Sequence, residues 1–284
     1  MNKRKPLLHV SLLFLLLAGC GTSNEAPIVT VTPTSVPAAT ATSTPVPTAT
    51  STPTPTATPE PTATPVPDEP LFVDFANGRP ADFEEANGWS NGNMFNVTWR
   101  KRNVTFKDGK MQLTIDNDKS PMNGIPYSGG EFRTKKFYGF GRYEVNMKAI
   151  KNDGVVSSFF TYTGPTDKNP WDEIDIEILG KDTTKVQFNY YTNGIGNHEY
   201  LYDLGFDASE DFHTYAFEWY PDKIVWFVDD VEVYTATVNI PVTKGKIMMN
   251  AWCGIGVDSW LKAFDNTNLP LTAEYHWIKF TPFE

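Results

Sequence analysis

The sequence predicts an all-β fold, a jelly-roll β-sandwich of two antiparallel sheets. From Leu71 onward, short runs alternate apolar and polar residues, and Gly, Asn, Asp and Pro separate them at intervals typical of a sandwich. Long amphipathic helices are absent from the pattern. Strands are therefore expected at residues 141–147, 155–163, 185–191, 212–220 and 246–252, and runs 224–228 and 231–235 flank Asp229-Asp230, a pair suited to a hairpin turn.

The N-terminus has the features of an export signal. Basic residues 3–5 precede an apolar run, residues 7–17, that is too short to span a bilayer as a helix. The run ends in LAGC, which resembles the lipobox of bacterial lipoproteins, whose cysteine carries lipid; ordinary cleavage after small residues is the alternative. We expect a signal peptide over residues 1–19 and lipidation of Cys20. The lipid would insert into the membrane and hold the protein on the outer surface of the bacterial cell.

Residues 20–70 are expected to form a linker between this anchor and a folded domain at residues 71–284. From Pro27 to Pro70 the chain is almost wholly Thr, Pro, Ala, Val and Ser, a composition that cannot form a core. Proline-rich chains extend by about 3.1 Å per residue, so this segment can reach on the order of 100 Å. Such a reach suits a protein that works on a polymer.

Composition excludes several classes of partner and cofactor. The net charge of −10 opposes nucleic-acid binding, which needs clustered Lys and Arg, and favours a neutral ligand. Two cysteines cannot build a disulfide framework, and no CxxC or HExxH pattern indicates zinc. We expect a monomer that requires no cofactor.

Residues 171–180, WDEIDIEILG, contain the candidate catalytic residues. In an extended strand Glu173, Asp175 and Glu177 project from one face, while the alternating isoleucines enter the core. Taken alone, this pattern is also typical of a solvated charged face. The two glutamates lie about 13 Å apart along the strand, and side chains that lean together can approach the roughly 5–5.5 Å carboxyl separation of a retaining glycosidase. We assign Glu173 as nucleophile, Asp175 as its supporting residue and Glu177 as acid/base.

Three segments carry a resemblance to a known family. GVVSSFFTYTGP (154–165), WDEIDIEILGKDTTKVQFNYYTNG (171–194) and GKIMMNAW (245–252) resemble bacterial lichenases of glycoside hydrolase family 16. The resemblance implies a cleft across the concave sheet and retaining endo-hydrolysis of mixed-linkage β-1,3-1,4-glucan, with the same three catalytic roles. It also implies a set of substrate-contacting residues: Asn91, Glu131, Arg133, Phe160, Tyr162, Trp171, Asn189, Tyr191, Glu199, Asn250 and Trp252.

Departures from the family pattern affect stability more than chemistry. Many relatives have a cysteine pair joining the segments near Val97 and Ser128, which this chain lacks. Cys253 is interpreted as an unpaired, buried thiol. Relatives commonly bind a structural calcium ion through an acidic residue near the last strand, and the matching position here is His276, a poor ligand for a hard cation. The sequence therefore does not favour calcium.

Two alternatives to a lichenase remain open at this stage. A β-1,3-glucanase (laminarinase) of the same fold is one, although that branch typically has an extra residue before the second glutamate, and this strand has the shorter spacing. A noncatalytic glucan-binding module is the other, although such a module does not need three aligned carboxylates.

Overall fold

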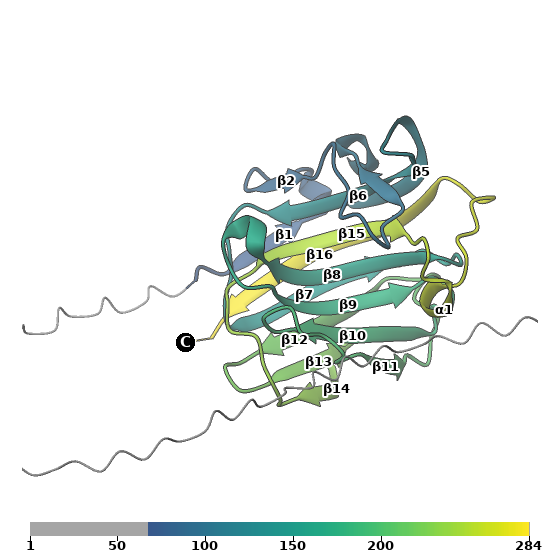
Figure 1. The fold of residues 1–284 in the computed structure, drawn as a ribbon. Helices are drawn as coiled ribbons and strands as arrows, with labels where there is room; N and C mark the ends of the chain where they lie inside the picture. Colours follow the sequence, from purple (N-terminus) through teal and green to yellow (C-terminus); the bar gives the residue numbers. More distant parts are fainter. Residues whose placement is uncertain (1–67, 284) are drawn as a thin grey trace, which may run out of the picture. The chain divides into compact units, whose positions relative to one another are not determined.

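The computed structural model describes residues 68–283, and within this range strands dominate (Figure 1). The predicted signal peptide (1–19), the lipidation site Cys20 and nearly all of the predicted linker lie outside the described residues. None of the helices between residues 68 and 283 has the length and apolarity needed to cross a bilayer.

The described elements are sixteen strands, three 3-10 turns and one short helix. The strands are β1 (Leu71–Asp74), β2 (Phe83–Glu85), β3 (Val97–Trp99), β4 (Val104–Lys107), β5 (Lys110–Met122), β6 (Ile125–Thr134), β7 (Gly141–Lys148), β8 (Val155–Thr163), β9 (Asp172–Leu179), β10 (Lys185–Tyr191), β11 (Tyr200–Asp203), β12 (His213–Trp219), β13 (Ile224–Val228), β14 (Val231–Ala236), β15 (Lys246–Cys253) and β16 (Leu271–Pro282). The others are η1 (Phe75–Asn77), η2 (Lys101–Asn103), η3 (Pro165–Asp167) and α1 (Asp258–Leu261).

The strands form two layers, which confirms the predicted sandwich. The first sheet has the order β11-β10-β9-β8-β15-β6, and the second has the order β5-β16-β7-β12-β13-β14. Pairing of β5 with β6 links the first sheet to the second at one edge, so the two layers are continuous there. The named strand pairs are antiparallel except β3 with β6, which are parallel.

The core lies between the two layers and is rich in aromatic rings. From the first sheet, Phe159 and Phe188 meet Phe217 and Trp226 of the second, with ring centroids 6.1 and 5.6 Å apart. All four side chains are fully buried. At roughly 25 cal/mol per Å2 of apolar surface, burial of rings of this size is the main term that holds the layers together.

The local predictions for individual strands are confirmed to within a residue or two. Strands β8, β10 and β13 have the expected bounds, and β12 begins at His213 instead of Phe212. The hairpin between β13 and β14 turns at Asp229 and Asp230, with φ angles of 47° and 63°. Two positive φ angles in succession define a type I′ turn, which short Asp side chains tolerate.

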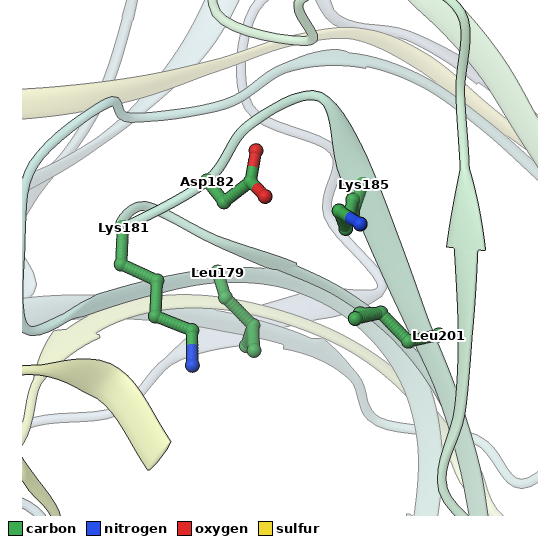
Figure 2. Close-up of a pocket in the computed structure, with 5 residues that line it drawn as sticks. All are labelled: Leu179, Lys181, Asp182, Lys185 and Leu201. Carbon is green, nitrogen blue, oxygen red and sulfur yellow. The ribbon is translucent and has the colours of Figure 1, made fainter. Parts of the chain in front are cut away.

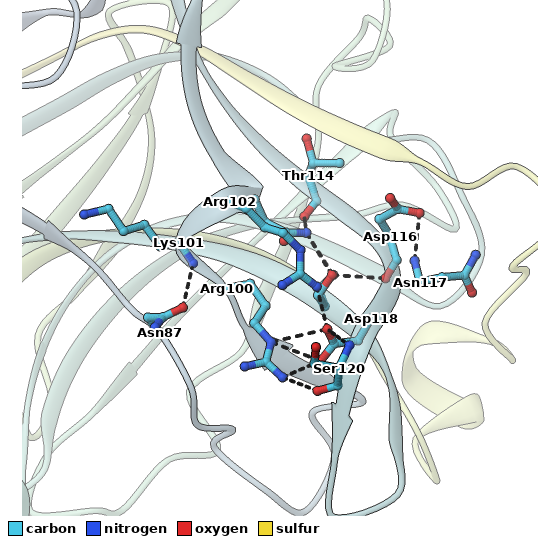
Figure 3. Close-up of polar contacts among 11 residues, drawn as sticks. Asn87, Arg100, Lys101, Arg102, Thr114, Asp116, Asn117, Asp118 and Ser120 are labelled. Atoms are coloured by element: carbon cyan, nitrogen blue, oxygen red, sulfur yellow. Dashed lines mark hydrogen bonds and ion pairs between the residues drawn. The ribbon is translucent and has the colours of Figure 1, made fainter.

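A buried ion cluster fixes the loop that precedes β4. Asp118 on β5 accepts hydrogen bonds from Arg100 at 2.7 Å and from Arg102 at 2.5 Å, and its side chain is fully buried (Figure 3). The Ser120 backbone N–H donates a further hydrogen bond to the same carboxylate. These donors outweigh the cost of burial and lower the pKa of Asp118.

Candidate active site

Strand β9 presents three of its acidic residues, Glu173, Asp175 and Glu177, on one face without interruption. Its pairing with β8 and with β10 proceeds residue by residue, with no register shift. Ile174, Ile176 and Ile178 are buried in the core at 1%, 0% and 0% exposure. Glu173, Asp175 and Glu177 therefore all point to the opposite face of the first sheet, as the period of two predicts.

Cross-strand register extends each acid into a row of side chains on that face, because directly paired residues project to the same side. The row through Glu177 is Glu131, Asn250, Ser158, Glu177 and Gln187. The row through Asp175 is Arg133, Met248, Phe160, Asp175 and Asn189. The row through Glu173 is Lys246, Tyr162, Glu173 and Tyr191. Most of the predicted substrate-contacting residues thus lie in the same three rows as the acids.

Glu173 is held by two hydrogen-bond donors. The Trp171 indole N–H donates to Glu173 Oε2 at 2.5 Å, and the Asp175 carboxyl is a second hydrogen-bond donor to Glu173. Burial raises the pKa of Glu173, and both hydrogen bonds oppose that rise because they favour the charged form. The arrangement stabilises the ionised form of a half-buried carboxylate, which suits the predicted role of nucleophile.

Asp175 is the most strongly perturbed of the three acids. Burial, followed by the charges of Glu173 and Glu177 on either side, raises its pKa well above the ordinary value. A protonated Asp175 can donate a hydrogen bond, whereas an ionised one cannot. Its place between the two glutamates therefore suits the predicted supporting role.

Glu177 has one donor and two negative neighbours. Gln187 Nε2 donates to Glu177 Oε2 at 2.8 Å. Burial raises the pKa of Glu177, the Gln187 hydrogen bond lowers it, and the charges of Glu173 and Glu199 raise it. Glu173 has two donors and Glu177 has one, an asymmetry that favours the charged form at Glu173 more than at Glu177 and agrees in direction with the predicted roles.

Glu131 and Arg133 form a polar cluster at the β6 end of these rows. Glu131 is 1% exposed, and burial raises its pKa to about 7, although Arg133 and the Asn250 amide oppose this rise. Its Oε1 atom lies 3.6 Å from the Arg133 guanidinium, too far for a hydrogen bond, and is otherwise unpartnered. Ser158 donates to Asn250 Oδ1 at 2.6 Å. These groups suit hydroxyl-rich ligands, which supply both donors and acceptors.

The predicted aromatic residues differ in how much ring they expose. Trp171, 39% exposed, stacks on Tyr191 with centroids 4.7 Å apart, and the two rings form a platform beside Glu173. Tyr162 is partly exposed in the Glu173 row. Phe160 lies on the same face but is 7% exposed. Trp252 is 3% exposed and packs beneath Phe95 at 4.1 Å, so its ring offers little free surface for stacking on a sugar.

Asn91 and Glu199 lie in loops outside the rows. Asn91 Oδ1 accepts a hydrogen bond from the buried Trp99 indole at 2.7 Å. This bond anchors the loop before β3. Glu199 precedes β11, and its charge raises the pKa of both Asp175 and Glu177. It is therefore close to the acidic trio.

Several residues at the site were not among the predicted site residues. Ser158 and Gln187 complete the Glu177 row, and the alternation of β8 and β10 was the available signal for both. Trp89 is 38% exposed with the Arg133 guanidinium 5.6 Å from its ring, and Trp260 donates to Gln187. Both tryptophans lie in segments without strand periodicity, so the sequence carried no comparable signal.

The surroundings of His276 do not fit a hard cation such as calcium. Its ring stacks on Phe212 with centroids 3.6 Å apart, and Lys110 and Lys148 lie 5.6 and 5.5 Å from the same Phe212 ring. Among residues 68–283, no group of three or more His, Cys, Asp or Glu side chains is arranged to hold a metal ion. Cys253 is a buried free thiol, as predicted, and burial raises its pKa.

Comparison with known proteins identifies the family to which most of the described residues belong. Residues 91–279 match the family model described as glycosyl hydrolases family 16. The chain is 62% identical over 214 residues to a xylanase/beta-glucanase of Ruminococcus flavefaciens, and this match covers 74% of the chain and 27% of that protein. It is 59% identical over 213 residues to a beta-glucanase of Acetivibrio thermocellus, and this match covers 75% of the chain and 63% of that protein.

A solved structure gives the same result at the level of the fold. The crystal structure of a prokaryotic beta-1,3-1,4-glucanase (lichenase) derived from a mouse hindgut metagenome is 56% identical, with a TM-score of 0.73. The match covers 75% of this chain and 99% of that one.

Proposed function

The chain belongs to glycosyl hydrolases family 16, and we propose that it is a retaining endo-β-1,3-1,4-glucanase that cleaves mixed-linkage β-glucan by double displacement. The observation that carries the proposal is the acidic face of β9, where Glu173 and Glu177 flank Asp175 with unequal hydrogen bonding. No separate cofactor takes part, because two carboxyl groups supply both the nucleophile and the proton.

In the first step, the Glu173 carboxylate attacks the anomeric carbon while Glu177 gives its proton to the departing glycosidic oxygen. The bond to the leaving sugar breaks and an ester to Glu173 forms. The Trp171 hydrogen bond holds one Glu173 oxygen in place during the attack. Loss of negative charge from Glu173 also makes it easier for Glu177 to bear charge after the transfer.

In the second step, Glu177, now ionised, takes a proton from water, and the resulting oxygen nucleophile breaks the ester to Glu173. Two inversions at the same carbon retain the β configuration. The product leaves with Glu173 ionised and Glu177 protonated, so the site returns to its starting state.

The role of Glu173 is tested by chemical rescue. Glu173→Ala should lose nearly all hydrolysis of barley β-glucan, and added azide should restore turnover of an aryl glycoside with an α-glycosyl azide as product. Glu177→Ala should give the β-glycosyl azide under the same conditions. A Glu173→Ala enzyme that remains fully active would disprove the assignment. Binding of β-glucan without release of reducing ends by the unmodified protein would favour a noncatalytic module.

Mixed linkage is supported over pure β-1,3-glucan by the strand and by similarity. Strand β9 carries no register shift beside either neighbour, consistent with the short spacing of its acids. The solved lichenase is 56% identical, whereas the laminarinase catalytic domain of Thermotoga maritima is 20% identical and shares the fold alone. Rates on lichenan and laminarin decide the point, and faster hydrolysis of laminarin would reverse it.

We also propose that the protein acts outside the bacterial cell, anchored through lipid on Cys20, with a linker over residues 20–70 and a monomeric catalytic domain over residues 71–284. Support comes from the LAGC sequence and the Thr/Pro-rich composition. Incorporation of labelled palmitate in a bacterial host should require Cys20, with Cys20→Ala as control. Light scattering of the purified domain should give the mass of one chain.

A further inference from the structure

The acid/base residue is connected to a loop outside the first sheet. Gln187 donates from Nε2 to Glu177 Oε2 at 2.8 Å, and the same amide accepts at Oε1 from the Trp260 indole N–H at 3.1 Å. The path Trp260, Gln187, Glu177 therefore consists of two consecutive hydrogen bonds that point in the same direction.

The chemistry of the indole fixes that direction. An indole N–H can only donate, so the Gln187 amide must turn its oxygen toward Trp260. Its NH2 group must then face Glu177. Without the indole, the amide could rotate by 180° and present its oxygen to Glu177 instead. We propose that Trp260 is a positioning residue, whose N–H locks Gln187 in the one orientation that donates to the acid/base carboxyl.

The loop that carries Trp260 is itself held in place. Lys181, in the turn between β9 and β10, donates from Nζ to the Trp260 carbonyl oxygen. Figure 2 shows Lys181 reaching from that turn toward the yellow segment that contains α1. The next residue, Leu261, is fully buried, and its carbonyl accepts from the Gly154 backbone N–H at 2.8 Å. Hydrogen bonds to the backbone carbonyls of Trp260 and Leu261 therefore hold the segment that carries the indole.

The arrangement leaves different tasks to the two oxygens of Glu177. Oε2 accepts from the Gln187 amide, so a proton on that oxygen would face another donor. The exchangeable proton therefore belongs on Oε1. Two neighbouring groups act on Glu177 through charge: Glu173 on β9 and Glu199 before β11 both raise its pKa. The Lys181 ammonium is engaged with the Trp260 carbonyl.

The expected changes in kcat/KM depend on the proposed function, whereas the expected change in the pKa of Glu177 does not. Trp260→Phe keeps the ring and removes the donor. A hydrogen bond to a charged group changes a pKa by about 1–2 units, and an amide that is free to rotate loses part of this effect. The pKa of Glu177 should therefore rise by roughly 0.5–1 unit in Trp260→Phe, and the alkaline limb of kcat/KM should move up equally.

A double-mutant cycle separates positioning from direct contact with substrate. Trp260→Phe should lower kcat/KM on β-glucan by about threefold to tenfold, the range of one neutral hydrogen bond. It should have no further effect in a Gln187→Leu background, because the residue acts through Gln187. An activated aryl glycoside, whose leaving group needs no proton, should lose much less. Trp277 lies in the middle of β16, in the second sheet, and packs against Phe72; Trp277→Phe is therefore the matched control and should behave as the unmodified protein.

Carboxyl 13C titration of Glu177, identified with Glu177→Gln, measures its pKa without any substrate. An unchanged pKa in Trp260→Phe, or an equal loss of activity with and without Gln187, would overturn the positioning role. Failure of the unmodified protein to hydrolyse any β-glucan would instead refute the proposed function, and the titration would still decide the role of Trp260.

Discussion

Removal of the Trp171 indole N–H should weaken the nucleophile in a pH-dependent way. Trp171→Phe keeps a ring that can stack on Tyr191 but deletes the 2.5 Å hydrogen bond to Glu173. That bond stabilises the ionised form of Glu173, so its loss raises the pKa of Glu173. A hydrogen bond to a charged group contributes about 1.5–3 kcal/mol, equivalent to roughly 1–2 pH units.

The lower end of this range applies here. Trp171 is 39% exposed, so water can replace part of the lost donor. The acidic limb of kcat/KM should therefore move up by about 1 pH unit, because the nucleophile must be ionised to attack. Below that limb, activity on β-glucan should fall by about tenfold. The ratio of variant to unmodified activity should then increase as the pH rises.

The measurement is a pH profile of kcat/KM on lichenan, with Trp277→Phe as a control for loss of a tryptophan remote from the acids. A ratio that is the same at every pH would show that Trp171 acts only through contact with the sugar. The proposed effect on Glu173 would then be wrong.

Three further predictions concern stability, each measured by urea unfolding. Asp172 accepts from the backbone N–H groups of residues 193, 242 and 243, so Asp172→Ala should lower the free energy of unfolding by about 2–4 kcal/mol; a loss below about 0.5 kcal/mol would contradict this. Asp118→Asn should lower the free energy of unfolding by about 1–3 kcal/mol at pH 7. This difference should disappear as the pH falls from the pKa of Asp118 in the unfolded chain through its lowered pKa in the folded protein, because protonation removes the same charge. A difference that persists at pH 2 would argue against it. Burial raises the pKa of Glu177 to about 7, so its stabilising contribution is present at low pH and lost as pH rises through 7; Glu177→Gln should stabilise the fold by roughly 1–3 kcal/mol at pH 8 and not at pH 4, and equal effects at both would refute it.

Features that depend on neighbouring residues were predictable from the sequence. Alternation placed Glu173, Asp175 and Glu177 on one face, and turn residues gave the bounds of β8, β10 and β13. Both signals depend on a strand's period of two and on local turn geometry. Neither needs information from a distant segment.

Features that depend on register between distant strands were not predictable from pattern alone. Ser158 and Asn250 share a hydrogen bond across 92 residues of sequence, and nothing local to either indicates the other. Trp252 is a predicted site residue whose exposure the sequence did not reveal. A tryptophan next to a predicted site suggests a platform for sugar, but Phe95, from a loop before β3, covers its ring. Only tertiary packing decides how much of a ring is exposed.

Two carboxylates of this chain show how the type of partner decides the task. Asp118 meets two arginines, and its pKa falls, so it stays charged and serves only to hold a loop (Figure 3). Glu177 is half-buried but meets the neutral amide of Gln187, and its pKa rises to about 7. A guanidinium beside Glu177 would fix the charged form and leave no proton to give. An amide donor orients the carboxyl without fixing its charge, which explains why a path of neutral donors through Gln187 to Trp260 suits an acid that must also act as a base.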